Sequence, residues 1–417
     1  MNREAFERLV GETAYHLTTP EAILPELERQ TLYHTEPRRE ALEGLADALA
    51  RAFAGSLGEA ERLLAGLASQ YREQPLCHYY LFAVQRQAGD VAAAKKSLGH
   101  LGRIDPGDPM VDLLHLHFAG QPIPGITEEL RLANIRKLAS TPFLKNPYQL
   151  AVGAIFEEIR DLEQARVLDV GVGSGAQMVE LLGLLQREPH RLRRLDIVGV
   201  DFVQQFLETA GRNILARAQE LAGRVTVSYR PVQGRIEALD GAALRAITSD
   251  GPLDAANASI ALHEVPGEAK WVALQNLRAL APGRFVLVEW NYCLENVLPE
   301  TGAEFLFNVR RVVAAMVAVL RERYPVVEAR DVVRGWLSQA GGQLTCPALQ
   351  RQECFLDAAS WKALLEASGF ALRPPDPNLL KYVERPDRAG TGPEPWYLAA
   401  YQDQRAAPIT LLEGVPG

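Results

Sequence analysis

The sequence predicts an α/β protein in which helices cover both faces of a mostly parallel sheet, preceded by an all-α region. Short apolar segments rich in β-branched residues recur at helix-length intervals, at 166–170, 195–200, 225–229, 254–262 and 285–289. Strands that alternate with helices in this way favour a parallel sheet. With 47% hydrophobic and 23% charged residues, the chain can bury a sizeable core.

Residues 3–120 predict a helical region, because apolar side chains such as Leu42, Leu45 and Leu49 recur at helical spacing. A glycine–acid pair followed by a proline occurs at 58–75 and again at 89–106, which resembles a degenerate tetratricopeptide-like repeat. A repeat region this short would need to pack on the rest of the chain. An irregular helical cap with coincidental spacing is an equal alternative.

Composition also indicates the domain boundaries. Glycine and proline are concentrated at 120–125, which favours a linker. A helical apolar stripe within 305–320 indicates core or a dimer face, and a closing strand is expected at 396–401. We therefore expect a helical domain at 1–120, a linker and lead-in helix at 121–146, a main domain at 147–401 with a helical cap insertion at about 299–322, and a frayed tail at 402–417.

Charge and cysteine usage exclude several partners and sites. The chain has 44 basic and 52 acidic residues and no dense Lys/Arg run, so nucleic acid is not expected as a partner. The four cysteines lack metal-site spacing, so no metal is expected. The N-terminus has no signal-peptide pattern and no stretch reaches ~18 apolar residues, so we expect a cytoplasmic protein without a membrane partner.

A glycine turn at 169–175, Asp-Val-Gly-Val-Gly-Ser-Gly, follows a buried strand and precedes a helix. Glycines let the backbone adopt positive φ and let a ligand approach closely. Asp201 ends the next strand, where a carboxylate can accept both hydroxyls of a ribose. The pattern predicts a nucleotide or nucleoside site.

The same glycines also fit the fingerprint of NAD-binding proteins, so the neighbouring residues decide the ligand. An acid two residues before the first glycine, the G-x-G-x-G spacing, and a candidate adenine border after the third strand favour S-adenosyl-L-methionine (SAM). NAD, or no ligand, remains the alternative. We therefore expect a Rossmann-like, seven-stranded class I methyltransferase fold, with cofactor contacts from Asp169, Gly171, Gly173, Gly175, Asp201, Arg235 and Ile236.

The segments around this motif resemble the GRAS family, a branch of SAM-dependent methyltransferase-like proteins known from plant regulators and with bacterial members. The matching stretches are 142–149, 262–266, 277–283, 288–291, 361–370 and 396–401. The glycine motif is intact here, whereas it is commonly eroded in the plant regulators. This departure from the plant pattern favours an enzyme.

Candidate catalytic groups follow the fourth and fifth strands, where open α/β sheets hold their ligands. His263 is a candidate base because its ordinary pKa suits proton transfer near neutrality, and Glu289 is a second candidate. A loop histidine and a buried structural acid are the alternative interpretations. The candidate substrate contacts are Tyr148, Glu264, Asn291, Tyr292 and Arg310.

The expected function is SAM-dependent methyl transfer to an O or N atom of a small-molecule acceptor, by a protein that can form a homodimer. One alternative is a non-catalytic module that binds a ligand or a protein. A second is an enzyme that consumes SAM by cyclisation and releases methylthioadenosine. An intact glycine turn supports binding in all three cases, because fold alone does not fix function.

Overall fold

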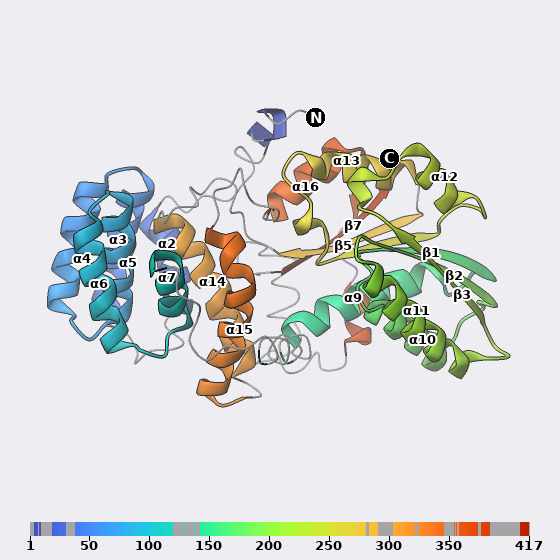
Figure 1. Cartoon of the computed structure of the whole chain (residues 1–417), viewed down its shortest axis with the longest axis horizontal. Coiled ribbons are helices and arrows are strands. Elements are labelled where there is room, and N and C mark those ends of the chain that lie inside the picture. Colours follow the sequence, from blue (N-terminus) through green and yellow to red (C-terminus); the bar gives the residue numbers. More distant parts are fainter. Residues whose placement is uncertain are drawn as a thin grey trace. The chain divides into compact units, whose positions relative to one another are not determined.

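The computed structural model describes residues 4–6, 8–9, 19–30, 38–119, 130, 137, 142–280, 283–290, 303–321, 324–345, 354, 356, 358–373, 377–383 and 409–416. The chain divides into two compact units (Figure 1). The α/β unit comprises 1–14, 145–292 and 352–417, and the helical unit comprises 15–144 and 293–351. Both units are therefore discontinuous in sequence.

A single sheet forms the centre of the α/β unit, with the strand order β3-β2-β1-β4-β5-β7-β6. The first five strands of this order run parallel to one another, and β7 pairs antiparallel with β5 and β6. The predicted α/β fold with a mostly parallel sheet is confirmed. The strands are β1 (Gln164–Val170), β2 (Arg194–Asp201), β3 (Thr226–Gln233), β4 (Ala255–Ser259), β5 (Arg284–Trp290), β6 (Phe370–Arg373) and β7 (Ile409–Pro416).

Helices cover both faces of this sheet, as Figure 1 shows. One face carries α9 (Pro142–Ile159), α10 (Ala176–Arg187) and α11 (Gln204–Ala218), and the other carries α12 (Gly241–Thr248), α13 (Ala269–Ala279) and α16 (Ala358–Ala367). Because both faces are covered, the central strands are largely buried, and six of the seven residues of β1 are buried. Short 3-10 turns lie at Gln219–Leu221, Ile236–Ala238, Leu262–Glu264 and Pro377–Tyr382.

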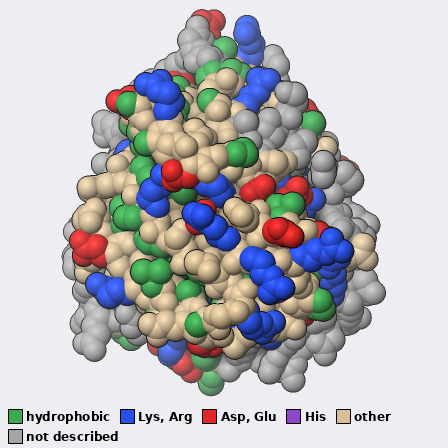
Figure 2. Space-filling model, turned by 90° about the vertical axis from the view of Figure 1, so that its right-hand side faces the viewer, with side chains coloured by type: hydrophobic (Ala, Val, Ile, Leu, Met, Phe, Trp, Pro, Cys, Tyr) green, Lys and Arg blue, Asp and Glu red, His purple; other side chains and the backbone are tan. Residues whose placement is uncertain are grey.

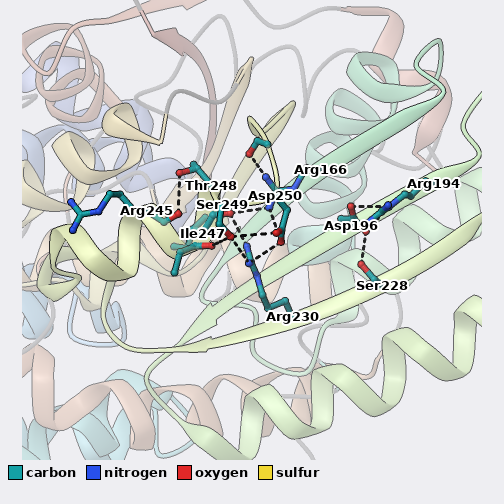
Figure 3. A network of polar contacts seen from close by, with 12 residues as sticks. Arg166, Arg194, Asp196, Ser228, Arg230, Arg245, Ile247, Thr248, Ser249 and Asp250 are labelled. Carbon is teal, nitrogen blue, oxygen red and sulfur yellow. Dashed lines mark hydrogen bonds and ion pairs between the residues drawn. The ribbon is translucent and has the colours of Figure 1, made fainter.

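Two arginines fix the carboxyl end of α12 against the sheet (Figure 3). Arg166 of β1 and Arg230 of β3 each donate to the carbonyl oxygen of Ile247, at 2.9 and 2.7 Å. Cations are favourable at a helix carboxyl end, where backbone carbonyls lack helical partners. Asp250 also accepts from Arg230, at 3.1 Å. The outer surface at this end of the unit carries side chains of both charge signs (Figure 2).

The end of the chain differs from the prediction. The strand expected at 396–401 lies outside the described residues. The predicted tail at 402–417 contains β7, which lies between β5 and β6, so the expectation of a frayed tail is wrong. A strand with partners on both sides gains its backbone hydrogen bonds from distant segments, and local sequence does not display those partners.

The helical unit joins helices from two separate parts of the chain, 15–144 and 293–351. Consecutive helices pack on each other from α2 to α7, and α14 packs on α2, α3 and α5, while α15 packs on α7. The insertion expected at about 299–322 thus coincides with α14 and belongs to the helical unit. The helices are α2 (Pro20–Gln30), α3 (Arg39–Phe53), α4 (Leu57–Gln70), α5 (Pro75–Gln87), α6 (Val91–Ile104), α7 (Pro109–Ala119), α14 (Ala303–Leu320) and α15 (Val326–Thr345).

A buried ion pair lies in the core of the helical unit. Arg310 of α14 donates to the Asp108 carboxylate at 2.8 Å, and both side chains are fully buried. The Arg310 guanidinium also lies over the Tyr79 ring, 4.6 Å from its centroid. The apolar stripe of α14 is buried around this pair, which identifies the stripe as core. None of the described helices has the length and apolar character needed to span a membrane.

Replacing Asp108 by Asn is expected to destabilise the protein by about 3–5 kcal/mol, because Arg310 would keep a buried charge without its counter-charge. Glu59→Gln is the control, since its partner Arg51 is exposed, and removal of such a pair costs less than about 1 kcal/mol. Urea denaturation monitored by circular dichroism measures the change in unfolding free energy for both variants. Equal losses of unfolding free energy in the two variants would show that the buried pair contributes no more to stability than the exposed pair.

Candidate functional site

The glycine turn after β1 has a backbone geometry that needs glycine. Gly171, Gly173 and Gly175 have φ values of 68°, 50° and 76°, in the left-handed region. A Cβ on Gly171 would lie 2.5 Å from the Cβ of Ala261, which follows β4. A Cβ on Gly175 would lie 3.1 Å from the Cα of Ala210 on α11. The turn therefore packs closely against the segment after β4 and against α11.

Asp201 links the end of β2 to the turn. Its Oδ2 accepts from the Gly173 amide at 3.0 Å, and its Oδ1 accepts from the Val203 amide at 2.9 Å. Each carboxylate oxygen has a second lone pair, so the group retains acceptor capacity. Asp201 thus supports the backbone and can still receive hydroxyl donors from a ligand.

Asp169 lies deeper, within the sheet. It is buried, and its Oδ1 accepts from the Asn257 side-chain amide of β4 at 2.7 Å. Burial raises the pKa of Asp169 to about 7, and the nearby Asp201 carboxylate acts in the same direction. Asn257 also donates to Gln177 of α10 and accepts from Ser259. Asp169 is therefore part of a buried polar cluster behind the turn.

A pocket of about 240 Å³ opens beside the turn. It brings together Gly171, Gly173, Asp201, Arg235, Ile236 and Glu264 from the predicted site residues. Phe202 and Phe206 also line it, with exposed fractions of 44% and 48%, and sequence reasoning missed both. The sequence could have indicated them, because Phe202 directly follows Asp201 and Phe206 lies four residues further on. The Arg235 guanidinium lies over the Phe202 ring, 4.3 Å from its centroid.

One wall of the pocket carries backbone strain. Ile260 follows β4 and lines the pocket with φ 51°, an unfavourable conformation for a β-branched residue. Its amide donates to the Val288 carbonyl of β5 at 2.7 Å, which helps hold it in place. Strained residues of this kind persist where surrounding contacts fix them, and they cluster at functional sites.

His263 and Glu289 hold the loop at 261–265. Glu289 is fully buried, and its Oε1 accepts from the amides of Ala261 and His263, at 2.9 and 3.0 Å. Its Oε2 lies 3.2 Å from the Nδ1 of His263. Burial acts to raise the pKa of Glu289, but the contacts with His263 and Lys270 outweigh it, so the pKa lies below the ordinary value. Neither His263 nor Glu289 is among the residues that line the pocket.

Lys270 completes the support of this loop from the other side. Its ammonium donates to the carbonyls of Leu262 and Val265, at 2.5 and 2.6 Å, and its side chain is fully buried. The Cys354 amide donates to the His263 carbonyl at 2.7 Å. The loop is thus tied at its amides and its carbonyls by groups outside the pocket.

The remaining predicted contacts are dispersed. The pKa of Tyr148 on α9 is raised by burial and by the Glu289 and Asp169 carboxylates, which places it near the buried acids. Arg310 lies in the helical unit, paired with Asp108, and is not brought to the pocket. Asn291 and Tyr292 lie outside the described residues. Among the described residues, no group of three metal-ligating side chains comes together.

Asp169→Asn is expected to stabilise the protein increasingly as pH rises. The carboxyl ionises near 3.8 in an unfolded chain and near 7 in the fold, so the wild type loses stability as pH rises from about 4 to about 7. Asn lacks this loss, and the difference should reach roughly 2–4 kcal/mol above pH 7. Urea denaturation at pH 4, 6 and 8 measures it. A difference that stays constant over this range would contradict a raised pKa.

The curated relatives that match this chain come from plants. Chitin-inducible gibberellin-responsive protein 2 of Oryza sativa subsp. japonica is 25% identical over 251 residues, which cover 56% of this chain and 44% of the relative. Scarecrow-like protein 21 of Arabidopsis thaliana is 25% identical over 248 residues, covering 55% of this chain and 56% of the relative. The chain therefore spans about half the length of these proteins.

The solved structure of SCL7 from Oryza sativa matches with a TM-score of 0.57 at 16% identity, over 76% of this chain and 93% of that chain. At this identity the likeness establishes the fold alone. A magnesium protoporphyrin IX methyltransferase from Synechocystis matches with a TM-score of only 0.36, which is too low to support an argument.

These comparisons correct the expected function. Both curated relatives have the names of regulatory proteins, and neither is named as an enzyme. The expectation of a small-molecule methyltransferase is therefore wrong, and so is the expectation of an enzyme. The expected partners, a small-molecule acceptor without nucleic acid, are overturned by the same finding. An intact glycine turn is compatible with binding and does not establish turnover.

The resemblance drawn from the sequence motifs is confirmed at the level of the family, but its assignment to a bacterial methyltransferase class is not. The model described as the GRAS domain family matches residues 127–383, which is more than half of the chain. The chain belongs to the GRAS domain family.

Proposed function

We propose that this protein is a regulator whose α/β unit binds an adenosyl ligand of the SAM type without transferring its methyl group. The observation that carries the proposal is the position of Asp201, which lines the pocket beside Gly171 and Gly173 while the Gly173 amide holds its carboxylate. The regulatory part rests on the family and on the names of the plant relatives.

The pocket fits the parts of such a ligand. The spare lone pairs of Asp201 can accept the two ribose hydroxyls. Ile236 and the exposed Phe202 offer apolar surfaces on which a flat adenine can lie. The glycines leave no Cβ between the turn and the ligand. Bound here, the ligand would supply an adenosyl group and a positive sulfonium as recognition features.

The lack of methyl transfer is supported by the engagement of the two predicted catalytic groups. Both oxygens of Glu289 contact backbone amides or the His263 ring, and the Glu289 side chain is fully buried. A general base must lie within hydrogen-bonding reach of the proton that it removes. His263 and Glu289 instead position the loop that forms the pocket wall. We propose that occupancy of the pocket is the signal that this regulator reads.

The proposal predicts that SAM binds the purified protein and that Asp201→Asn weakens binding at least about tenfold, or about 1.4 kcal/mol. Asp196→Asn, on the same strand but bonded to Arg194 and Ser228, is the matched control and should leave binding unchanged. Isothermal titration calorimetry measures each affinity. Equal binding by both variants, or no binding by the wild type, would remove the basis of the proposal.

Incubation with SAM should also release no S-adenosylhomocysteine (SAH) above the level of a protein-free sample, as measured by mass spectrometry. The His263→Ala variant is expected to behave like the wild type in this assay, because His263 supports the loop and does not line the pocket. Release of SAH by the wild type and its loss in His263→Ala would restore a catalytic role.

A further inference from the structure

The charges and hydrogen bonds of the pocket point to a selectivity that goes beyond ligand binding. We infer that the pocket prefers a positively charged, phosphate-free adenosyl ligand over neutral and anionic ones, and so distinguishes SAM from SAH. The inference rests on the proposed function and concerns the same pocket. The site itself is defined by the pocket and the glycine turn, and the net charge of the lining decides its selectivity.

The first step is that the turn has few amides left for a phosphate. In dinucleotide-binding folds the glycine-turn amides and the following helix N-terminus hold the pyrophosphate. Here the amides of Gly171 and Val172 both donate to the Val200 carbonyl, at 2.8 and 3.1 Å. The Gly173 amide donates to Asp201, and the Gly175 amide donates to the Val172 carbonyl at 2.8 Å. Four of the five turn amides, at 171–173 and 175, are thus already bonded, which disfavours the pyrophosphate of NAD and the phosphates of ATP.

The second step is the charge of the lining. Among the described residues that line the pocket, three are acidic, Asp201, Glu237 and Glu264, and one is basic, Arg235. Arg235 lies over the Phe202 ring, and its Nη1 is 3.6 Å from the Glu237 carboxylate. The basic side chain is thus already balanced by one of the acids, which leaves the lining negative.

The third step is that neighbouring groups respond to this negative charge. The pKa of Glu264 is raised mainly by burial. The Asp201 carboxylate acts in the same direction, whereas His263 and Arg235 act in the opposite one. The pKa of Tyr229 on β3 is raised to about 12 by burial and by Asp169 and Asp201. These groups lie on different elements and all respond to the carboxylates at this edge of the sheet. A cation in the pocket would be attracted by the Asp201, Glu237 and Glu264 carboxylates and would offset the repulsion among them.

These steps separate SAM from its product. SAM carries a sulfonium cation, whereas SAH has the same adenosine and amino acid without that charge. A single charge near partly solvated carboxylates changes affinity by about tenfold. The pocket would therefore bind SAM, the methyl donor, in preference to SAH, its demethylated product. The regulator would report the supply of activated methyl groups.

The test is calorimetric titration of the full chain with SAM, SAH, adenosine and ATP at low ionic strength. SAM should bind about tenfold more tightly than SAH or adenosine, and ATP should bind more weakly than adenosine. Glu264→Gln should bring the affinity for SAM to within about twofold of that for SAH. Raising the salt concentration should reduce the preference for SAM in the wild type.

Glu208→Gln is the matched control, because Glu208 is an exposed acid of α11 that bonds Gln204 and does not line the pocket. It should keep the wild-type preference. If SAH or ATP binds as tightly as SAM, the charge selectivity is overturned while adenosyl binding stands. If neither SAM nor adenosine binds, the proposed function fails and the selectivity fails with it.

Discussion

The hydrogen bond from the Gly173 amide to the Asp201 carboxylate is the contact on which the geometry of the pocket depends. Parallel pairing of β1 with β2 brings the carboxyl ends of both strands to one edge, with Val170 opposite Val200. The glycine turn leaves β1 with backbone amides that need acceptors, and Asp201 supplies one of them. The same carboxylate holds the Val203 amide just ahead of α11, so one side chain fixes the turn and the approach to the next helix.

The part of the site that sequence predicted is the part encoded locally. A buried strand, three glycines and an acid at the end of the next strand are short-range patterns, and the structure assembles Gly171, Gly173 and Asp201 as expected. Arg235 and Ile236 also lie in the pocket, because they follow β3 at the same edge of the sheet. The α/β class followed from strands that alternate with helices, which is again a local signal.

The parts that sequence did not predict depend on distant partners. Arg310 has a buried counter-charge just ahead of α7, and neither its own helix nor its spacing indicates Asp108. Strand β7 is specified by β5 and β6 on its two sides. Glu289 was predicted as a catalytic candidate with a buried structural acid as the alternative, and its contacts are with the backbone of the loop after β4. The residue type at a strand end therefore indicates which reactions the side chain could support. It does not indicate whether the side chain faces a ligand.

The discontinuous helical unit has a consequence for the order in which the chain folds on the ribosome. Asp108 leaves the ribosome 202 residues before Arg310, and the whole central part of the sheet is synthesised between them. Domains usually fold as units during synthesis, beginning from the N-terminal side. The early helices therefore pack on α14 only after it emerges. The helical unit thus begins first and is completed only after most of the α/β unit has been made.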